Sequence, residues 1–275
     1  MTPTYGTSPL PPLETLRGRR ALVTGAALAE RLAAVGVDVV VTGRTEHAGD
    51  SGLYGSLAEV AERIARHGVR VGTVVADLTD PEQRTGIVPS AEELLGGPID
   101  LLVNNAAAAI YQPLADYPLH RRHLVFEANV HVPLDLVQAV LPGMLARGEG
   151  WIVNVSSATA RLRQGPPFVL VPPGTAMSVY GASTAALNRL TNGLGAELLG
   201  TGVRVNGVEP RFGVLTEGAD ALVGELIDTA VMESMAEMVE AILALCRCSA
   251  EVAGQAMVSL DLIDHWKVPV NGTGP

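Results

Sequence analysis

Cysteine and lysine are scarce in this sequence. The two cysteines, Cys246 and Cys248, are too few for a disulfide framework or a zinc site, so we expect a reducing compartment and no bound metal. Lysine occurs once, as Lys267 beyond the last expected strand, while the other basic residues are arginines. A site elsewhere in the chain that needs an ammonium group therefore has none available nearby.

Long apolar runs and a positive surface charge are also missing. No run of about 18 apolar residues occurs, and residues 1–12 lack the basic and apolar parts of a secretory signal. The formal net charge is -10, which repels phosphate backbones and anionic lipids. We therefore expect a cytoplasmic protein that binds neither nucleic acid nor membrane.

What the sequence does contain is a regular alternation of apolar, strand-like runs and helical patterns. Strands are expected at 21–24, 37–42, 71–76, 99–103, 151–155, 203–208 and 255–260, and helices at 28–36, 57–67, 81–95, 119–147, 179–199 and 235–246. Strands that are apolar on both faces and alternate with helices predict an α/β fold, a single-domain Rossmann-like doubly wound parallel sheet with helices on both faces. We expect this domain at residues 16–262, between a flexible N-terminal tail (1–15) and a C-terminal tail (263–275).

Short motifs follow the expected strands, where ligands bind in such sheets. They are Thr24-Gly25-Ala26, Asp77, Asn104-Asn105-Ala106, Ser156-Ser157, Tyr180-Gly181-Ala182-Ser183 and Arg204-Val205-Asn206-Gly207-Val208-Glu209-Pro210. In this order and on these elements, the motifs resemble those of the short-chain dehydrogenases/reductases, over about residues 16 to 262. The resemblance implies a dinucleotide-binding fold and hydride transfer between a nicotinamide cofactor and a carbonyl or alcohol.

The resemblance also assigns catalytic roles. It implies that Tyr180 is the acid/base, that Ser157 orients the substrate oxygen, and that Asn129 supports a proton relay through water. The family has a lysine four residues after the tyrosine, but this position holds Thr184. An ammonium about 5 Å from the phenol, at an effective dielectric constant near 20, lowers the phenol pKa by about two units. We therefore expect hydride transfer to be lost or much reduced.

A second set of residues is implied to bind the cofactor. It consists of Gly25, Arg44, Asp77, Asn104, Ala106, Thr184, Pro210 and Thr216. The glycine-rich turn after the first strand is about six residues shorter than the family pattern, which removes phosphate contacts and weakens binding. Arg44 stands where an acidic residue selects NAD, so any cofactor is expected to be NADP, unless Arg44 is only a solvated loop residue. Asp77 either faces the adenine or caps a turn.

Substrate and partner surfaces are suggested by apolar stripes. The 22 residues between Ser157 and Tyr180 include an inserted loop, 165–174, whose apolar stretch 168–171 either walls a pocket with Ile110 and Tyr111 or packs on the core. We therefore expect a small apolar substrate or ligand. We also expect Arg161 and Arg163 to face solvent.

In relatives, the helices that correspond to 119–147 and 179–199 pair between subunits. Their apolar stripes predict a homodimer or tetramer, or a heteromer with an active family member, unless the stripes face only their own sheet. The residues are Leu124, Val132, Leu136, Val140, Leu190, Leu194 and Leu198.

Three functions fit these observations. The first is a protein of this family that has lost or largely lost redox chemistry, as a pseudoenzyme subunit or with Tyr180 and Ser157 reused in a non-redox step. The second is a weak NADP-dependent carbonyl reductase or alcohol dehydrogenase for an apolar substrate. The third is a non-catalytic binding or scaffold module.

Overall fold

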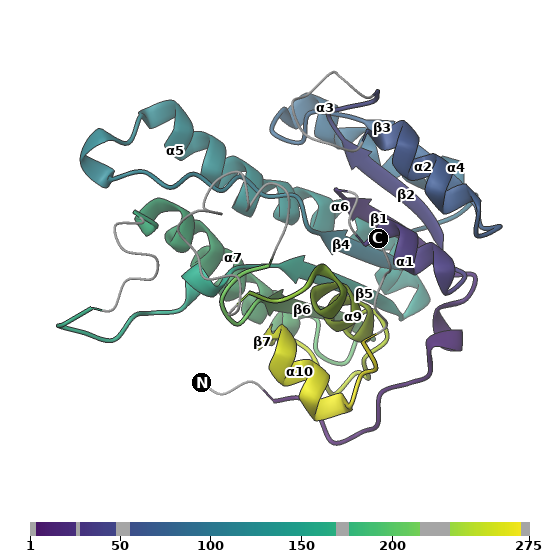
Figure 1. Cartoon of the computed structure of the whole chain (residues 1–275). Coiled ribbons are helices and arrows are strands. Elements are labelled where there is room, and N and C mark those ends of the chain that lie inside the picture. The colour runs from purple at the N-terminus through teal and green to yellow at the C-terminus, as the bar shows by residue number, and fades with distance from the viewer. Residues whose placement is uncertain (1–3, 26–27, 48–55, 169–175, 215–231, 271–275) are drawn as a thin grey trace.

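Seven parallel strands form one sheet, in the order β3-β2-β1-β4-β5-β6-β7 (Figure 1). The computed structural model describes residues 4–25, 28–47, 56–168, 176–214 and 232–270. The predicted α/β doubly wound architecture is confirmed. The strands are β1 (Arg20–Thr24), β2 (Asp38–Gly43), β3 (Val71–Val75), β4 (Leu101–Asn104), β5 (Gly150–Val155), β6 (Val203–Glu209) and β7 (Ala256–Val258).

Helices connect the strands and cover both faces of the sheet (Figure 1). The α-helices are α1 (Ala29–Ala34), α2 (Leu57–Ala65), α3 (Pro81–Thr85), α4 (Ile87–Leu95), α5 (Leu119–Phe126), α6 (Val132–Arg147), α7 (Ser178–Glu197), α9 (Met235–Leu245) and α10 (Ser259–Trp266). Shorter turns are η1 (Leu13–Leu16), η2 (Leu114–Asp116), the π-helical η3 (Glu127–His131) and η4 (Ala158–Ala160).

The side chains of the strands alternate between two hydrophobic cores. Val39 and Val41 of β2 pack in one core, with residues of α1, α2, α9 and α10, while Val40 packs in the other, with residues of α4 and α6. Successive side chains of a strand point to opposite faces, so a strand buried on both faces must be apolar throughout. This explains why the expected strands read as continuous apolar runs.

After β3, at one edge of the sheet, the chain returns to its middle, where β4 lies next to β1 on the side opposite β2. Thr24 at the end of β1 lies in register with both Thr42 of β2 and Asn104 of β4. Ligands of doubly wound sheets bind at such a switch point, beyond the carboxyl ends of the strands. The motifs after β1 and β4 are therefore brought to one place.

The prediction of a strand at 255–260 is wrong for its last two residues, 259 and 260. β7 ends at Val258, and α10 begins at Ser259. The buried residues of this helix, Ser259, Leu262 and Ile263, are spaced three and four apart, which is a helical period. Within the described part of the chain, β7 is the edge strand of the sheet and pairs with β6 through its three residues.

The long helix expected at 119–147 is present as α5, η3 and α6 in succession. By length and composition it could cross a membrane, but a single helix of this kind is weak evidence for a span, because core helices share these features; 44% of its apolar window is buried inside the protein. Val132, Leu136 and Val140 pack in the core against their own sheet, whereas Leu124 is 38% exposed. Most of the stripe on this helix is therefore explained within one chain.

The N-terminal segment lies against the C-terminal part of the chain. The Ser8 hydroxyl donates to Glu251 over 2.9 Å, and the Tyr5 ring stacks on His265 with centroids 4.8 Å apart. The Arg247 guanidinium donates to the carbonyl oxygen of Pro11. Residues of the predicted N-terminal tail thus contact a region more than 200 residues away in sequence.

Both cysteines are free and fully buried just after α9, with Cys246 as the C-cap of this helix. Burial raises the pKa of the Cys246 thiol, and it raises that of Cys248 to about 12. Both residues are therefore held as neutral thiols packed like small apolar side chains.

Candidate active site

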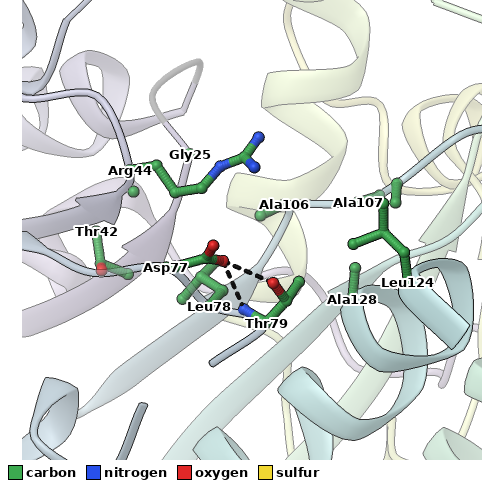
Figure 2. A pocket seen from close by; sticks show the side chains of 12 residues that line it. Gly25, Thr42, Arg44, Asp77, Leu78, Thr79, Ala106, Ala107, Leu124 and Ala128 are labelled. Carbon is green, nitrogen blue, oxygen red and sulfur yellow. Dashed lines mark hydrogen bonds between the residues drawn. The ribbon is translucent and has the colours of Figure 1, made fainter. Parts of the chain in front are cut away.

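A pocket of about 260 Å³ opens beyond the carboxyl ends of β1, β2 and β4 (Figure 2). It contains four of the predicted cofactor residues, Gly25, Arg44, Asp77 and Ala106. The rest of its lining was not among the predicted cofactor residues and consists of Thr42, Gly43, Leu78, Thr79, Ala107, Ala108, Leu124 and Ala128. Residues 26–27, which belong to the turn that the sequence analysis expects to be short, lie outside the described part of the chain.

The turns after β1 and β4 are held together by one hydroxyl group. The Thr24 Oγ1 accepts hydrogen bonds from the backbone N–H groups of Asn105 and Ala106, each 2.9 Å away. Gly25 has φ +84°, and a Cβ there would lie 2.9 Å from the Asn105 amide nitrogen, so only glycine fits without strain. Among the described residues other than glycine, Lys267 alone has positive φ, so the alanines after Asn105 sit in ordinary backbone conformations.

Asp77 both caps a turn and lines the pocket. Its Oδ1 accepts from the backbone N–H and the hydroxyl of Thr79, at 2.9 and 2.7 Å (Figure 2). The exposed Arg44 guanidinium lies near Gly25, on the side of the pocket formed by β1 and β2 (Figure 2). The pocket therefore has a cationic edge on one side and an apolar floor at Leu78 and Ala106.

The predicted catalytic residues form a second cluster, at the start of α7 and the end of β5. Tyr180 is 8% exposed, and the Tyr111 ring meets it edge-on with centroids 5.6 Å apart. Burial raises the pKa of the Tyr180 phenol, while its hydrogen bond with Ser157 lowers it to a lesser extent. Burial likewise raises the pKa of Tyr111, to about 12. Both phenols are therefore neutral at pH 7.

Thr184 is buried one turn beyond Tyr180. Its hydroxyl lies 3.2 Å from the carbonyl oxygens of Tyr180 and Gly181, to which it donates, so the side chain is bound to its own helix. A hydroxyl engaged in this way brings no positive charge to the phenol. The position implied to carry the lysine is therefore filled by a neutral group that is satisfied locally.

Asn129 connects the catalytic cluster to the pocket. Its Nδ2 donates to Ser183 Oγ over 3.0 Å, and Ser183 in turn donates to the Tyr180 carbonyl over 2.7 Å. The Asn129 Oδ1 accepts from the backbone N–H of Ala108, a pocket residue, over 2.8 Å. The π-helical turn η3 carries Asn129 and so positions it between the two regions.

A buried carboxylate lies beside this cluster, at the end of β6. Glu209 is 4% exposed and accepts from Asn188 over 3.0 Å, and Arg161 lies 3.1 Å from it. Burial raises the pKa of Glu209 more than Asn188 and Arg161 lower it. Arg161 is exposed, as expected, but its guanidinium also pairs with Glu209 and donates to the Pro210 carbonyl.

The other predicted residues are placed as follows. The Asn104 side chain is buried, and its Nδ2 donates to Asn154 over 2.9 Å, while its Oδ1 has no hydrogen-bond partner in the described part of the chain. Pro210 contributes a carbonyl oxygen to Arg161. Phe168 is 58% exposed, and both the rest of the apolar stretch, 169–171, and Thr216 lie outside the described residues.

Thr159 and Glu209 are the cluster residues that sequence reasoning missed. Thr159 stands two residues after Ser157, the spacing at which a serine side chain caps its own turn, and this signal was available in the sequence. Glu209 is part of a motif quoted for the family resemblance, but its burial and its pairing with Arg161 depend on the folded position of η4.

The sequence of this chain is similar to those of known proteins. The short chain dehydrogenase family model matches residues 20–225. Gluconate 5-dehydrogenase of Gluconobacter oxydans is 34% identical over 221 residues, which are 78% of each chain. L-xylulose reductase of Bos taurus is 36% identical over 204 residues, covering 71% of this chain and 72% of the relative.

Solved structures of dehydrogenases and reductases are also similar to this chain. A gluconate 5-dehydrogenase from Burkholderia cenocepacia, in complex with NADP and tartrate, superposes with a TM-score of 0.73 at 27% identity and covers 90% of this chain and 96% of its own. A 3-oxoacyl (acyl-carrier-protein) reductase from Agrobacterium tumefaciens with NADP bound gives 0.72 at 28% identity, covering 90% and 96%.

Proposed function

This chain belongs to the short-chain dehydrogenase family, and on that premise we propose that it is an NADP(H)-dependent oxidoreductase for small apolar carbonyl compounds whose hydride transfer is much reduced. The observation that carries the proposal is Thr184. Its hydroxyl is bound to the backbone of α7, one turn from a catalytic phenol that has no cation beside it in the described cluster.

The chemistry follows from the protonation state of the Tyr180 phenol. Because burial raises its pKa above 10, the phenol at pH 7 is a proton donor. It can protonate a carbonyl oxygen that Ser157 also orients, which is the step that reduction needs. Oxidation needs the phenolate, which forms only at high pH. Both directions are slow, since a phenol of raised pKa is also a weaker acid.

The pocket residues fit one half of a dinucleotide. The volume of the pocket, about 260 Å³, is slightly below the roughly 300 to 1,000 Å³ of sites that hold a whole drug-sized ligand. Thr42, Asp77 and Leu78 would hold the adenosine half, and Arg44 would face a 2′-phosphate. When bound, NADPH supplies the hydride.

From the sequence we infer that the short turn after Gly25 would offer fewer backbone N–H groups to the pyrophosphate. Two such bonds, at about 1.5 to 3 kcal/mol each, correspond to about 10² to 10⁴ in affinity. We therefore propose weak binding. For the assembly we propose a cytoplasmic homodimer or tetramer, or a heteromer with an active family member.

Calorimetric titration with NADPH and NADH tests this proposal. We expect the wild type to bind NADPH with a dissociation constant below about 1 mM, and Arg44→Ala to weaken NADPH by about 10-fold or more while leaving NADH unchanged. Arg66→Ala is the matched control, since Arg66 is an exposed arginine paired only with the neighbouring Glu62 in the described residues. No NADPH binding at millimolar concentration would contradict the proposal.

Turnover is the second part of the test. Oxidation of NADPH with small apolar aldehydes and ketones, followed by absorbance at pH 7, is expected to be slow but abolished by Tyr180→Phe. Binding of NADPH without any Tyr180-dependent turnover would instead favour the reading as a pseudoenzyme subunit, which purification with its neighbours in the cell would then examine.

A further inference from the structure

The Ser157 hydroxyl receives two hydrogen bonds from a single residue. The backbone N–H of Thr159 donates to Ser157 Oγ over 3.2 Å, and the Thr159 hydroxyl donates to the same oxygen over 2.9 Å. A serine hydroxyl has two acceptor lone pairs and one hydrogen. With both lone pairs filled, Ser157 keeps only its own hydrogen for another partner.

Thr159 lies in a turn that contacts two other elements. Its Oγ1 lies 3.3 Å from the Thr184 hydroxyl, a packing contact, since the hydrogens of both hydroxyls are directed to other acceptors. α7 approaches the backbone of η4 closely at Gly181, where a Cβ would lie 2.7 Å from the Thr159 carbonyl oxygen. At the end of η4, Arg161 pairs with the buried Glu209. The turn is thus bound to α7 on one side and to β6 on the other.

We propose that Thr159 is a positioning residue of this site, which fills both acceptor positions of the Ser157 hydroxyl and so makes Ser157 an obligate donor, to the Tyr180 phenol oxygen in the free protein and to the substrate oxygen when a substrate is bound. The catalytic meaning of this role rests on the proposed function. The hydrogen-bond arrangement does not, because it involves only residues of this chain.

The consequence for Tyr180 has a definite sign. A donor aimed at the phenol oxygen stabilises the phenolate, whereas a free lone pair on Ser157 would let the neutral phenol donate to it and would stabilise the neutral form. Thr159 therefore favours ionisation of a phenol that burial disfavours. In a site without a neighbouring ammonium group, Ser157 is the described side chain that lowers the Tyr180 pKa.

The substrate oxygen is subject to the same restriction. A carbonyl oxygen offers lone pairs and no hydrogen, so it matches an obligate donor at Ser157 and a second donor at Tyr180. An acceptor at Ser157 would instead repel it. The Thr159 arrangement thus selects for carbonyl compounds and disfavours ligands that must donate to Ser157.

Titration of the Tyr180 phenol by ¹⁹F NMR tests the proposal without cofactor or substrate. Fluorinated tyrosine, whose phenol titrates nearer to neutrality, is incorporated, and Tyr180→Phe identifies the signal. We expect Thr159→Val, which keeps the shape and the backbone N–H but removes the hydroxyl, to raise the Tyr180 pKa by about half a unit to one unit. Thr159→Ser, which retains the hydroxyl, restores the wild-type value.

Two controls separate this role from a general effect on structure. Thr201→Val removes a hydroxyl that donates to the Leu198 carbonyl over 2.7 Å, at the other end of α7, and should leave the Tyr180 pKa unchanged. In a Ser157→Ala background, Thr159→Val should cause no further shift, because its effect passes through Ser157. Thr159→Ala serves as a second deletion of the hydroxyl if Thr159→Val has a lowered melting temperature.

An unchanged Tyr180 pKa in a folded Thr159 variant, or an equal shift in the Ser157→Ala background, overturns the proposal. With turnover, Thr159→Val is expected to lower kcat for carbonyl reduction several-fold and to leave the dissociation constant of NADPH unaltered. If the wild type binds no NADPH, the proposed function fails while the NMR comparison still decides the role of Thr159.

Discussion

The proposed chemistry of the site depends on the protonation state of the Tyr180 phenol. Its pKa is raised by burial, and the residue one turn further along α7 is a threonine bound to the helix backbone. The pH dependence of kcat/KM for alcohol oxidation should therefore keep rising beyond pH 10, because the phenolate is still accumulating there.

Restoring the cation should move this profile. In Thr184→Lys, an ammonium about 5 Å from the phenol lowers the Tyr180 pKa by about two units, and the midpoint of the oxidation profile falls by the same amount. Thr85→Lys places the same charge on exposed α3 as a control and should leave the midpoint unchanged. A midpoint that stays in place in folded Thr184→Lys would show that Tyr180 is not the titrating group.

Glu209 gives a prediction about stability. Its pKa is raised above 4.5 by burial, so the folded protein binds the proton more tightly than the unfolded chain does. The stability associated with the neutral acid is fully present below about pH 4.5 and is lost as pH rises through the raised pKa. The free energy of unfolding of Glu209→Gln, relative to wild type, should therefore increase from pH 4.5 upward and then level off.

Urea denaturation at several pH values measures this difference. Glu62→Gln, at a surface position whose side chain is 74% exposed, serves as the control and should show little pH dependence. A difference between Glu209→Gln and wild type that shrinks as pH rises would contradict the assignment and would mean that Arg161 outweighs the cost of burial.

At the scale of single residues, motif positions in the sequence predicted that some candidate residues lie close together, but they did not reveal others. Tyr180, Ser157 and Asn129 stand at fixed motif positions, and hydrogen bonds link Asn129 through Ser183 to the Tyr180 backbone. Thr159 and Glu209 matter through directed hydrogen bonds and burial, and these arise only when η4, α7 and β6 meet.

At the scale of elements, helix α7 packs closely against another segment at a position where glycine has no Cβ atom. A Cβ at Gly195 would lie 2.3 Å from the backbone of Gly254, whereas at Gly193 the nearest atom is the end of the flexible Arg189 side chain, at 3.1 Å. Both glycines lie inside the same helix, two residues apart. They therefore form a matched pair with opposite expectations.

Gly195→Ala should lower the free energy of unfolding by about 1 to 3 kcal/mol, since the backbone must move to admit the methyl group. Gly193→Ala should raise it by up to about 1 kcal/mol, because alanine favours the helix and its methyl group has room. Thermal and urea denaturation of both variants provide the measurement. Equal effects of the two substitutions would contradict the packing of α7 against residues 253–254.

Element boundaries were predictable where burial follows a single period. β2 and α2 were found within two residues of their ends, since β2 is apolar on both faces and α2 begins with the Ser56 capping box. The change from β7 to α10 was missed because three strand residues are too few to establish an alternation before the helical spacing begins.

On the scale of the whole molecule, the N-terminal segment contributes to the fold from outside the sheet. Tyr5, Ser8 and Pro11 contact the C-terminal part through stacking and hydrogen bonds. A chain that lacks residues 1–11 should therefore be less stable by about 1 to 3 kcal/mol.

Chemical denaturation of this truncated chain tests the prediction, and Tyr5→Ala should reproduce part of the loss. An unchanged midpoint for the truncation would show that the segment lies on the surface without contributing to stability. A parallel, doubly wound sheet could be predicted from the alternation of strands and helices, but these contacts could not, because no periodic pattern marks a segment that folds back over 240 residues.

The thiols of Cys246 and Cys248, which follow α9 in the sequence, offer an intrinsic probe of unfolding. Because both are fully buried and remain protonated, a thiol reagent such as a maleimide can label them only when this part of the core opens. The labelling rate of the unmodified chain, read by mass spectrometry, therefore reports how often the core is breached. The labelling rates of the variants described above can therefore be compared directly, with no dye or tag added to the protein.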